Sequence, residues 1–89
     1  MRAVISVIGK DRVGIIAGIS TVLAECNVNI LDLSQTIMQE IFTMVMMVDV
    51  SKSLISFANL SERLEDKGRE LGLSVKIQHE DIFSSMHRI

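Results

Sequence analysis

Residues 8–20 read IGKDRVGIIAGIS and decide the fold, because a β-branched run passes through a short polar turn into an apolar helical run. Backbone N–H groups at a helix start attract anions, which makes the KDRVG turn at residues 10–14 a candidate ligand site. A phosphate-binding loop needs Lys and then Ser or Thr after its last glycine, but Ile15 and Ile16 follow Gly14. No second glycine follows Gly9 at the dinucleotide-binding spacing. The turn therefore does not predict nucleotide binding.

The composition predicts one small domain that associates with a second copy. A chain of 89 residues has room for a single core and buries a modest share of its surface. Hydrophobic residues make up 48 % of the chain and aromatic residues only 3 %, so the core must be aliphatic, with the six methionines as adaptable filler. Since this apolar fraction is high for so small a body, we expect a homodimer that shares apolar surface.

Charge and hydropathy exclude several classes of function. The net charge of −2 comes from nine basic and eleven acidic residues scattered along the chain, which predicts no nucleic-acid binding. Cys26 is the only cysteine, so no intramolecular disulfide forms, as is typical of a reducing compartment. The first ten residues resemble a strand rather than a signal peptide, and no run approaches the ~20 apolar residues of a membrane span. We expect a cytoplasmic protein with no membrane partner.

Periodicity predicts four strands, over residues 2–8, 27–38, 41–50 and 73–81, and two helices, over 13–25 and 56–71. The first strand is apolar on both faces, as in a central strand covered on each side. Gln39 and Glu40 form the turn between the second and third strands. Ser56 is expected to cap the second helix and Gly72 to end it, with Glu65 and Arg69 pairing on its wet face. Residues 82–89 form a tail with no assignable period.

The inward faces follow from the same alternation. In the second strand these are Leu31, Leu33 and Ile37; in the third, Phe42, Met44, Met46, Val48 and Val50; in the fourth, Leu73, Val75 and Ile77. The element order is βαββαβ. Two right-handed crossovers joined by a hairpin predict an α+β, ferredoxin-like fold: a four-stranded antiparallel sheet with both helices on one face. Because the other face stays open, Val45 and Met47 would be exposed in a monomer, which again favours a dimer.

The segment DRVGIIAGISTVLAECNVNILDLSQ, residues 11–35, resembles the first half of the ACT domain, a ferredoxin-like module that in many proteins binds amino acids and regulates metabolism. Similar segments open the formyltetrahydrofolate hydrolases and occur in glycine-cleavage repressors. The ending GLSVKIQHEDIFSSMHRI is similar to that of small stand-alone ACT proteins. The resemblance thus covers residues 1–89 as a single ACT domain.

The resemblance implies a small-molecule ligand, with an amino acid as the expected one, at a subunit interface. One chain would supply the first strand-to-helix turn and the other chain the start of the second strand. The implied residues are Gly9, Asp11, Arg12, Val13 and Gly14 from one chain, and Asn27, Asn29, Ile30 and Leu31 from the other. The helix start suits a carboxylate, Asp11 suits an ammonium, and Gly14 permits close approach of the backbone.

Structural roles remain open for the same residues. Asp11 is equally a candidate cap of the first helix, and Arg12 a solvated turn residue. Gly14 and Gly18 are equally candidates for close packing of the helix. Asn29 is also a strand-entry residue.

No catalytic constellation is visible in the sequence, so we do not expect an enzyme. Cys26 lies on an apolar stripe, where a buried thiol is the usual state. His79 and His87, near Glu80 and Asp81, lack metal-ligand spacing, and no metal or cofactor is expected. The sequence hypothesis is a regulatory sensor that reports an amino acid level to a partner protein. The alternative is a protein–protein interaction module that holds no ligand.

Overall fold

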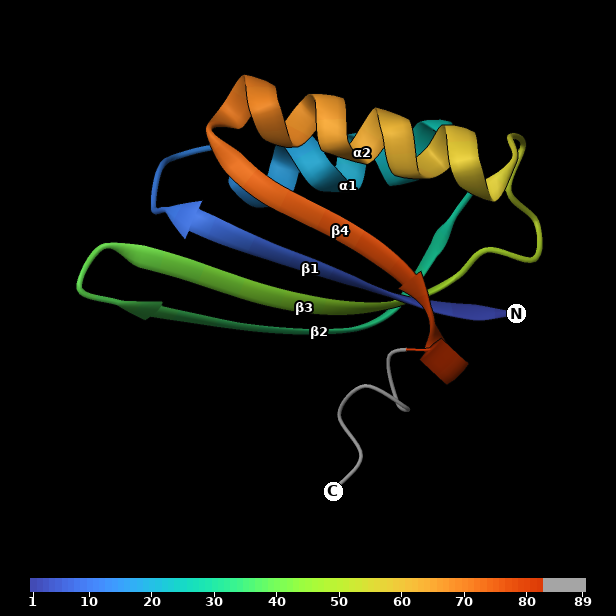
Figure 1. Ribbon diagram of the computed structural model, residues 1–89, viewed down its shortest axis with the longest axis horizontal. Helices are drawn as coiled ribbons and strands as arrows, with labels where there is room; N and C mark the ends of the chain where they lie inside the picture. Colours follow the sequence, from blue (N-terminus) through green and yellow to red (C-terminus); the bar gives the residue numbers. More distant parts are fainter. Residues whose placement is uncertain (83–89) are drawn as a thin grey trace.

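The computed structural model describes residues 1–82 and confirms the ferredoxin-like arrangement. Its elements are β1 (Arg2–Lys10), α1 (Ile15–Glu25), β2 (Asn29–Met38), β3 (Ile41–Asp49), α2 (Phe57–Leu71) and β4 (Leu73–His79). The strands form one antiparallel sheet in the order β2-β3-β1-β4. Both helices cover the same face of this sheet, so the molecule has one helical layer and one sheet layer (Figure 1).

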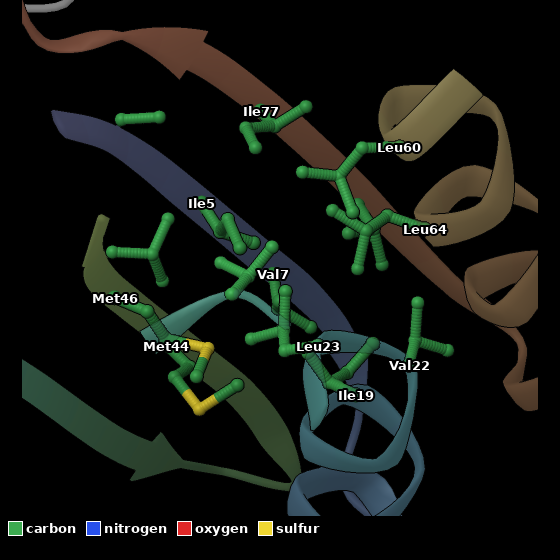
Figure 2. Packing of buried hydrophobic residues seen from close by; sticks show 14 of the residues in the cluster. Ile5, Val7, Ile19, Val22, Leu23, Met44, Met46, Leu60, Leu64 and Ile77 are labelled. Atoms are coloured by element: carbon green, nitrogen blue, oxygen red, sulfur yellow. The ribbon is translucent and has the colours of Figure 1, made fainter. Parts of the chain in front are cut away.

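The core fills the space between the two layers. Alternation turns every second residue of β3 toward the helices, and the inward-facing side chains Phe42, Met44, Met46 and Val48 are buried as predicted. Ile5 and Val7 of the neighbouring strand meet them from β1 (Figure 2). The helices contribute Ile19, Val22, Leu23, Leu60 and Leu64. The core is therefore aliphatic and methionine-rich, with Phe42 as its one fully buried aromatic residue among the described part of the chain.

The second face of β1 is only partly covered, which corrects the expectation of a strand buried on both sides. Val4 is 2 % exposed, but Ile8, four residues further along the same face, is 50 % exposed. Val45 on β3 is 40 % exposed and Met47 is half-buried. The reason is that both helices lie on the opposite face.

Several predicted boundaries shift because of local backbone geometry. α1 begins at Ile15 rather than residue 13, since Gly14 has a left-handed φ of 95°. β2 begins at Asn29 rather than residue 27, since Asn27 has a φ of 59°. β1 extends to Lys10, while β3 and β4 end at Asp49 and His79, shorter than predicted.

A β-bulge corrects the predicted face of the second strand. The register with β3 passes from Ile30 directly to Asp32, so Leu31 is the extra residue and is 46 % exposed. Gln35 and Ile37 are exposed on the helix side, although Ile37 was expected to point into the core. Edge strand β2 therefore buries none of its side chains completely.

The β2–β3 hairpin and α2 agree closely with the predictions made from the sequence. Gln39 and Glu40 form the β2–β3 turn with φ of 48° and 71°, the pair of positive values that a two-residue type I′ turn requires. The Ser56 Oγ accepts a hydrogen bond from the backbone N–H of Asn59 at 3.1 Å, and Gly72 ends the helix with a φ of 74°. Arg69, however, pairs with Asp66 and not with Glu65. Of the predicted tail, residues 83–89 lie outside the described part.

Candidate functional site

The KDRVG turn is fixed to the neighbouring hairpin. The backbone N–H of Asp11 donates to the carbonyl oxygen of Glu40 at 2.8 Å, which joins the turn to the β2–β3 loop. Asp11 does not cap α1, because the N-cap residue is Gly14 and no side chain caps the helix. The cap hypothesis for Asp11 is therefore wrong. Its exposed side chain is left available at the rim of the turn.

The start of α1 is open to solvent and carries no negative charge. A side chain at Gly14 would meet nothing within 4 Å, so the glycine is required by its left-handed backbone and not by packing. No acidic residue occupies the first turn of the helix. Val13 beside it is 98 % exposed. Backbone N–H groups of a first turn without a side-chain cap, at the positive end of the helix dipole, suit an anionic group.

Arg12 and two glycines have structural partners. The Arg12 Nη1 donates to the carbonyl oxygen of Leu71 at 3.2 Å, at the end of α2, so Arg12 is more than a solvated turn residue. A Cβ at Gly9 would lie 2.6 Å from the Leu73 side chain, so Gly9 allows β4 to approach. A Cβ at Gly18 would lie 3.0 Å from the side chain of Leu71, which identifies Gly18 as a helix-packing position.

Two residues of the second predicted group, Asn27 and Asn29, line a small pocket at the other end of α1, whereas Ile30 and Leu31 are exposed outside it. Asn27, in its left-handed conformation, donates from Nδ2 to the carbonyl oxygen of Lys52 at 3.0 Å. Asn29 is exposed beside it. The pocket is lined by Ala24, Asn27, Val28, Asn29, Asp49, Ser51 and Lys52.

Asp49 is a pocket residue that the sequence analysis missed. Its Oδ1 accepts hydrogen bonds from the backbone N–H of Ser51 at 2.9 Å and from the Ser51 Oγ at 2.7 Å. These two bonds, helped by the terminal ammonium of Met1 at 3.5 Å, hold the pKa of Asp49 below its ordinary value of 3.8. The sequence did contain a signal for this turn, because an Asp two residues before a Ser, as in Asp49 and Ser51, is typical of an Asx turn. The pocket thus contains an ionised carboxylate at neutral pH.

One chain does not bring the two predicted groups together. Gly14 and Asn27 flank α1, and an eleven-residue helix is roughly 16 Å long. The pocket that contains Asn27 and Asn29 includes no residue of the KDRVG turn. A site that uses both groups therefore needs two copies of the chain.

Other candidate chemistry is not assembled in residues 1–82. This part of the chain holds no group of three or more His, Cys, Asp or Glu side chains that could bind a metal ion. His79 stacks on Phe57 with ring centroids 4.0 Å apart, and His87 lies outside the described residues. Cys26 is buried, as expected, and the Arg63 Nη1 donates to its Sγ at 3.1 Å. No helix within these residues has both the length and the apolarity to cross a membrane.

The element order and the four-stranded antiparallel sheet define a ferredoxin-like module. The profile of the ACT domain matches residues 2–78, and the chain belongs to the ACT domain family. A UPF0237 protein of Clostridium acetobutylicum is 60 % identical over 89 residues, covering 100 % of both chains. An ACT domain protein from Streptococcus pneumoniae has a similar structure, with a TM-score of 0.81 and 41 % identity over 98 % of each chain. A formyltetrahydrofolate deformylase from Pseudomonas syringae shares the fold, with a TM-score of 0.80 and 23 % identity over 88 % of this chain and 27 % of that one.

Proposed function

We propose that this ACT domain works as a homodimeric sensor, in which an amino acid binds between the KDRVG turn of one chain and residues 27–31 of the other. One observation carries the proposal: the two predicted groups lie at opposite ends of the exposed edge strand β2. Asn29 begins this strand, and Glu40, just after its end, is hydrogen-bonded to Asp11. When two copies of such an edge pair antiparallel about a two-fold axis, the start of one strand lies beside the end of the other.

The β2 edge is suited to this pairing. It is ten residues long, lies at the border of the sheet, and contains neither Lys nor Pro, which commonly protect an edge strand from association. Its bulge is confined to Leu31, and residues 32–38 stay in continuous register with β3. All its residues are exposed except Leu33, which is half-buried. Backbone hydrogen bonds across a paired edge would satisfy the N–H and C=O groups that a single chain turns to water.

Apolar surface beside the edge supports the same contact. On the helix side of β2, Ile30 is 37 % exposed and Ile37 is 56 % exposed. Ile16 on the neighbouring α1 is 39 % exposed, and this helix carries no charge before Glu25. A two-fold axis through β2 would place these side chains against their counterparts, and burying them would favour association.

The chemistry at the junction matches an amino acid. The uncapped first turn of α1 offers N–H groups to a carboxylate, and Asp11 offers a carboxylate to an ammonium. The partner copy would bring the side-chain amide of Asn29, which both donates and accepts hydrogen bonds. No reaction is needed for such a site to work, and the proposed role is regulation of a partner protein rather than catalysis.

Association is tested by the mass of the particle in solution. Light scattering at micromolar concentration should show a dimer for the natural chain. Ile37→Asp should give a monomer, because it places a charge on the apolar strip beside the edge. Thr36→Asp is the matched control: it lies one position earlier on the opposite face of β2 and should remain dimeric. A monomeric natural chain would sink the proposal.

Ligand binding is tested by thermal unfolding with each of the twenty amino acids at millimolar concentration. A ligand at a hundredfold excess over Kd stabilises the native state by about 2.7 kcal/mol, which for a small domain raises the midpoint by roughly 10 °C. Asp11→Ala and Asn29→Ala should each remove the rise, whereas Asp66→Ala, on the wet face of α2, should retain it. A rise that survives both site substitutions would place the ligand elsewhere.

The uncharged exposed surface of α1 also supports the alternative, a docking module without a ligand. In that case no amino acid would change the unfolding midpoint. Capture of a partner protein would depend on Ile16, since Ile16→Asp removes apolar contact, and would be indifferent to Asp11→Ala.

A further inference from the structure

The small pocket at the C-terminal end of α1 contains a carboxylate oxygen that is available to a ligand. The Asp49 Oδ1 accepts hydrogen bonds from the backbone N–H and the Oγ of Ser51 and lies 3.5 Å from the terminal ammonium of Met1. Within residues 1–82, the Oδ2 of Asp49 accepts no hydrogen bond from another residue. The bonds from Ser51 therefore orient the carboxylate through one oxygen and leave the other as an acceptor.

Two amide side chains lie beside this carboxylate. Asn29 is the cross-strand neighbour of Asp49 in the register of β2 and β3, and directly opposite residues have Cβ atoms about 4.5–5.5 Å apart. The Asn29 side chain is exposed and makes no hydrogen bond to the described part of the chain. Asn27 donates through Nδ2 to the carbonyl oxygen of Lys52, which leaves its Oδ1 as a further acceptor.

The walls of the pocket are joined to one another. The backbone N–H of Leu54 donates to the carbonyl oxygen of Cys26 at 2.9 Å, and the bond from Asn27 to Lys52 measures 3.0 Å. These bonds connect the end of α1 to the loop after β3, which lies beside it (Figure 1). A pocket that is already formed requires little ordering of the chain when a ligand binds.

Size and charge select the kind of ligand. The cavity volume is about 200 Å³, smaller than the roughly 300–1,000 Å³ of pockets for drug-sized molecules. The C-terminal end of α1 is the negative end of the helix dipole and favours a positive group. A metal ion is not favoured, because residues 1–82 hold no group of three or more His, Cys, Asp or Glu that could bind one. A primary ammonium, with three N–H donors, suits one carboxylate oxygen and neutral oxygens beside it.

The chain's own terminus shows the same preference. The α-ammonium of Met1 approaches Asp49, but both side chains are exposed by more than a third, so the contact is weak and leaves the charge of Asp49 available. We propose that this pocket binds the primary ammonium group of a small amino acid, with the Asp49 Oδ2 as the acceptor and Asn27 and Asn29 beside it. The exposed Lys52, also at the pocket, favours a ligand that carries a carboxylate as well.

The inference rests on the proposed function only for the choice of an amino acid. All the lining residues belong to one chain, so recognition of the ammonium does not require a second copy. In the proposed dimer, Asp49 would enter the ligand site together with Asn29 of the same copy. The KDRVG turn of the other copy would then contact the carboxylate of the ligand.

Three matched small molecules test the proposal. They are glycine, glycolate, which has a hydroxyl in place of the ammonium, and ethanolamine, which has a hydroxymethyl in place of the carboxylate. The chain is used without an N-terminal tag, because Met1 lies close to Asp49. Amide NMR should show saturable shifts of the Ser51 backbone and Asn29 side-chain signals with glycine and ethanolamine and none with glycolate. The same result is expected for Ile37→Asp, which prevents pairing of the β2 edges.

Asp49→Asn is the critical variant, because asparagine keeps the Oδ1 acceptor for Ser51 and loses the charge. It should weaken glycine binding by about tenfold or more, since a hydrogen bond to a charged group is lost. In the Ile37→Asp background, Asp11→Asn and Asp66→Asn should bind glycine as the parent does. Far-UV circular dichroism checks that each variant is folded. If Asp49→Asn does not fold, glycine against glycolate on the natural chain still tests the charge.

The outcomes separate this proposal from the proposed function. Equal shifts with glycine and glycolate, no shift with any of the three molecules, or unchanged affinity in Asp49→Asn would overturn the role of Asp49 and leave the dimeric site to its own tests. Binding that is lost in Ile37→Asp would also overturn it and assign the ammonium to the junction of two copies. Binding that depends on Asp49 in a chain that never dimerises would support this pocket and contradict the dimeric sensor.

Discussion

The two helices lie side by side on one face of the same sheet, yet their sequences are built in different ways (Figure 1). α2 has a side-chain cap from Ser56, a glycine stop at Gly72, and charged residues along its outer face. α1 has no side-chain cap, no charge before Glu25, and exposed apolar residues at its start. The helices therefore share an architectural role but differ in the surface they present.

The difference is informative because folding requires neither the charged outer face of α2 nor the uncharged outer face of α1. The outer face of α2 is covered by short-range ion pairs, such as Lys67 with Glu70, which contribute little to stability and keep the helix hydrated. The outer face of α1 includes Ile16 at 39 % exposure and small uncharged residues such as Ala17 and Ala24. The outer face of a helix that remains in water is usually charged, as it is in α2. An outer face without charge, as in α1, is typical of a helix that contacts another protein.

The largest expected effect on stability compares a side chain that is buried within its own chain, Leu64, with one that is exposed and available to a partner, Ile16. Leu64→Ala on α2 should lower the free energy of unfolding by about 2–5 kcal/mol, since Leu64 is fully buried and its removal leaves a cavity. Ile16→Ala on α1 should cost less than about 1 kcal/mol at concentrations where the protein is monomeric, because this side chain is already partly hydrated. Urea denaturation at low and high protein concentration measures both.

The cost of Ile16→Ala should grow with protein concentration, whereas the cost of Leu64→Ala should not. Concentration-independent costs for both variants would remove the contrast between the two helices.

The next effect compares one glycine in each helix. A Cβ at Gly68 of α2 would lie 2.7 Å from the Val75 side chain and 2.9 Å from the carbonyl oxygen of Leu73. Because a backbone atom cannot easily move, Gly68→Ala should destabilise by about 1–3 kcal/mol despite the better helix propensity of Ala. A Cβ at Gly18 of α1 would lie 3.0 Å from the end of the flexible Leu71 side chain.

Gly18→Ala should therefore be close to neutral, because a small movement of Leu71 offsets a helix-propensity gain of up to about 1 kcal/mol. Thermal unfolding midpoints of the two alanine variants give the comparison directly. Equal losses would mean that α1 is held against α2 as rigidly as α2 is held against β4.

Periodicity predicted the parts of the fold that depend on local alternation. The buried face of β3 from Phe42 to Val48, the Ser56 cap and the end of α2 at Leu71 were correct, since binary patterning and a Ser cap act over a few residues. The start of α1 was predicted two residues early, because the left-handed backbone at Gly14 is not visible in the pattern of apolar residues. The bulge at Leu31 depends on how β2 meets β3, which alternation alone does not report.

The candidate site was less predictable for the same physical reason. Arg12 donates a hydrogen bond to Leu71, which lies 59 residues away in the sequence. The backbone N–H of Asp11 donates to Glu40, in the hairpin between β2 and β3. The resemblance to the ACT domain implied both groups of ligand residues. The structure adds that these groups lie at opposite ends of one exposed edge, which sequence spacing does not reveal.

The smallest predicted effect uses the same substitution in both helices. Ser56→Ala should lower the free energy of unfolding by about 1 kcal/mol, because it removes the acceptor of the Asn59 N–H bond at the start of α2. Ser20 lies inside α1, where its Oγ donates back to the carbonyl oxygen of Ile16 at 2.7 Å. That bond competes with regular helix geometry, so Ser20→Ala should be neutral or stabilise the chain by up to roughly 0.5 kcal/mol. Urea denaturation of both variants decides the sign. A loss at Ser20 as large as the loss at Ser56 would show that the hydroxyl supports α1 at its surface, and that α1 is better adapted to water than its composition indicates.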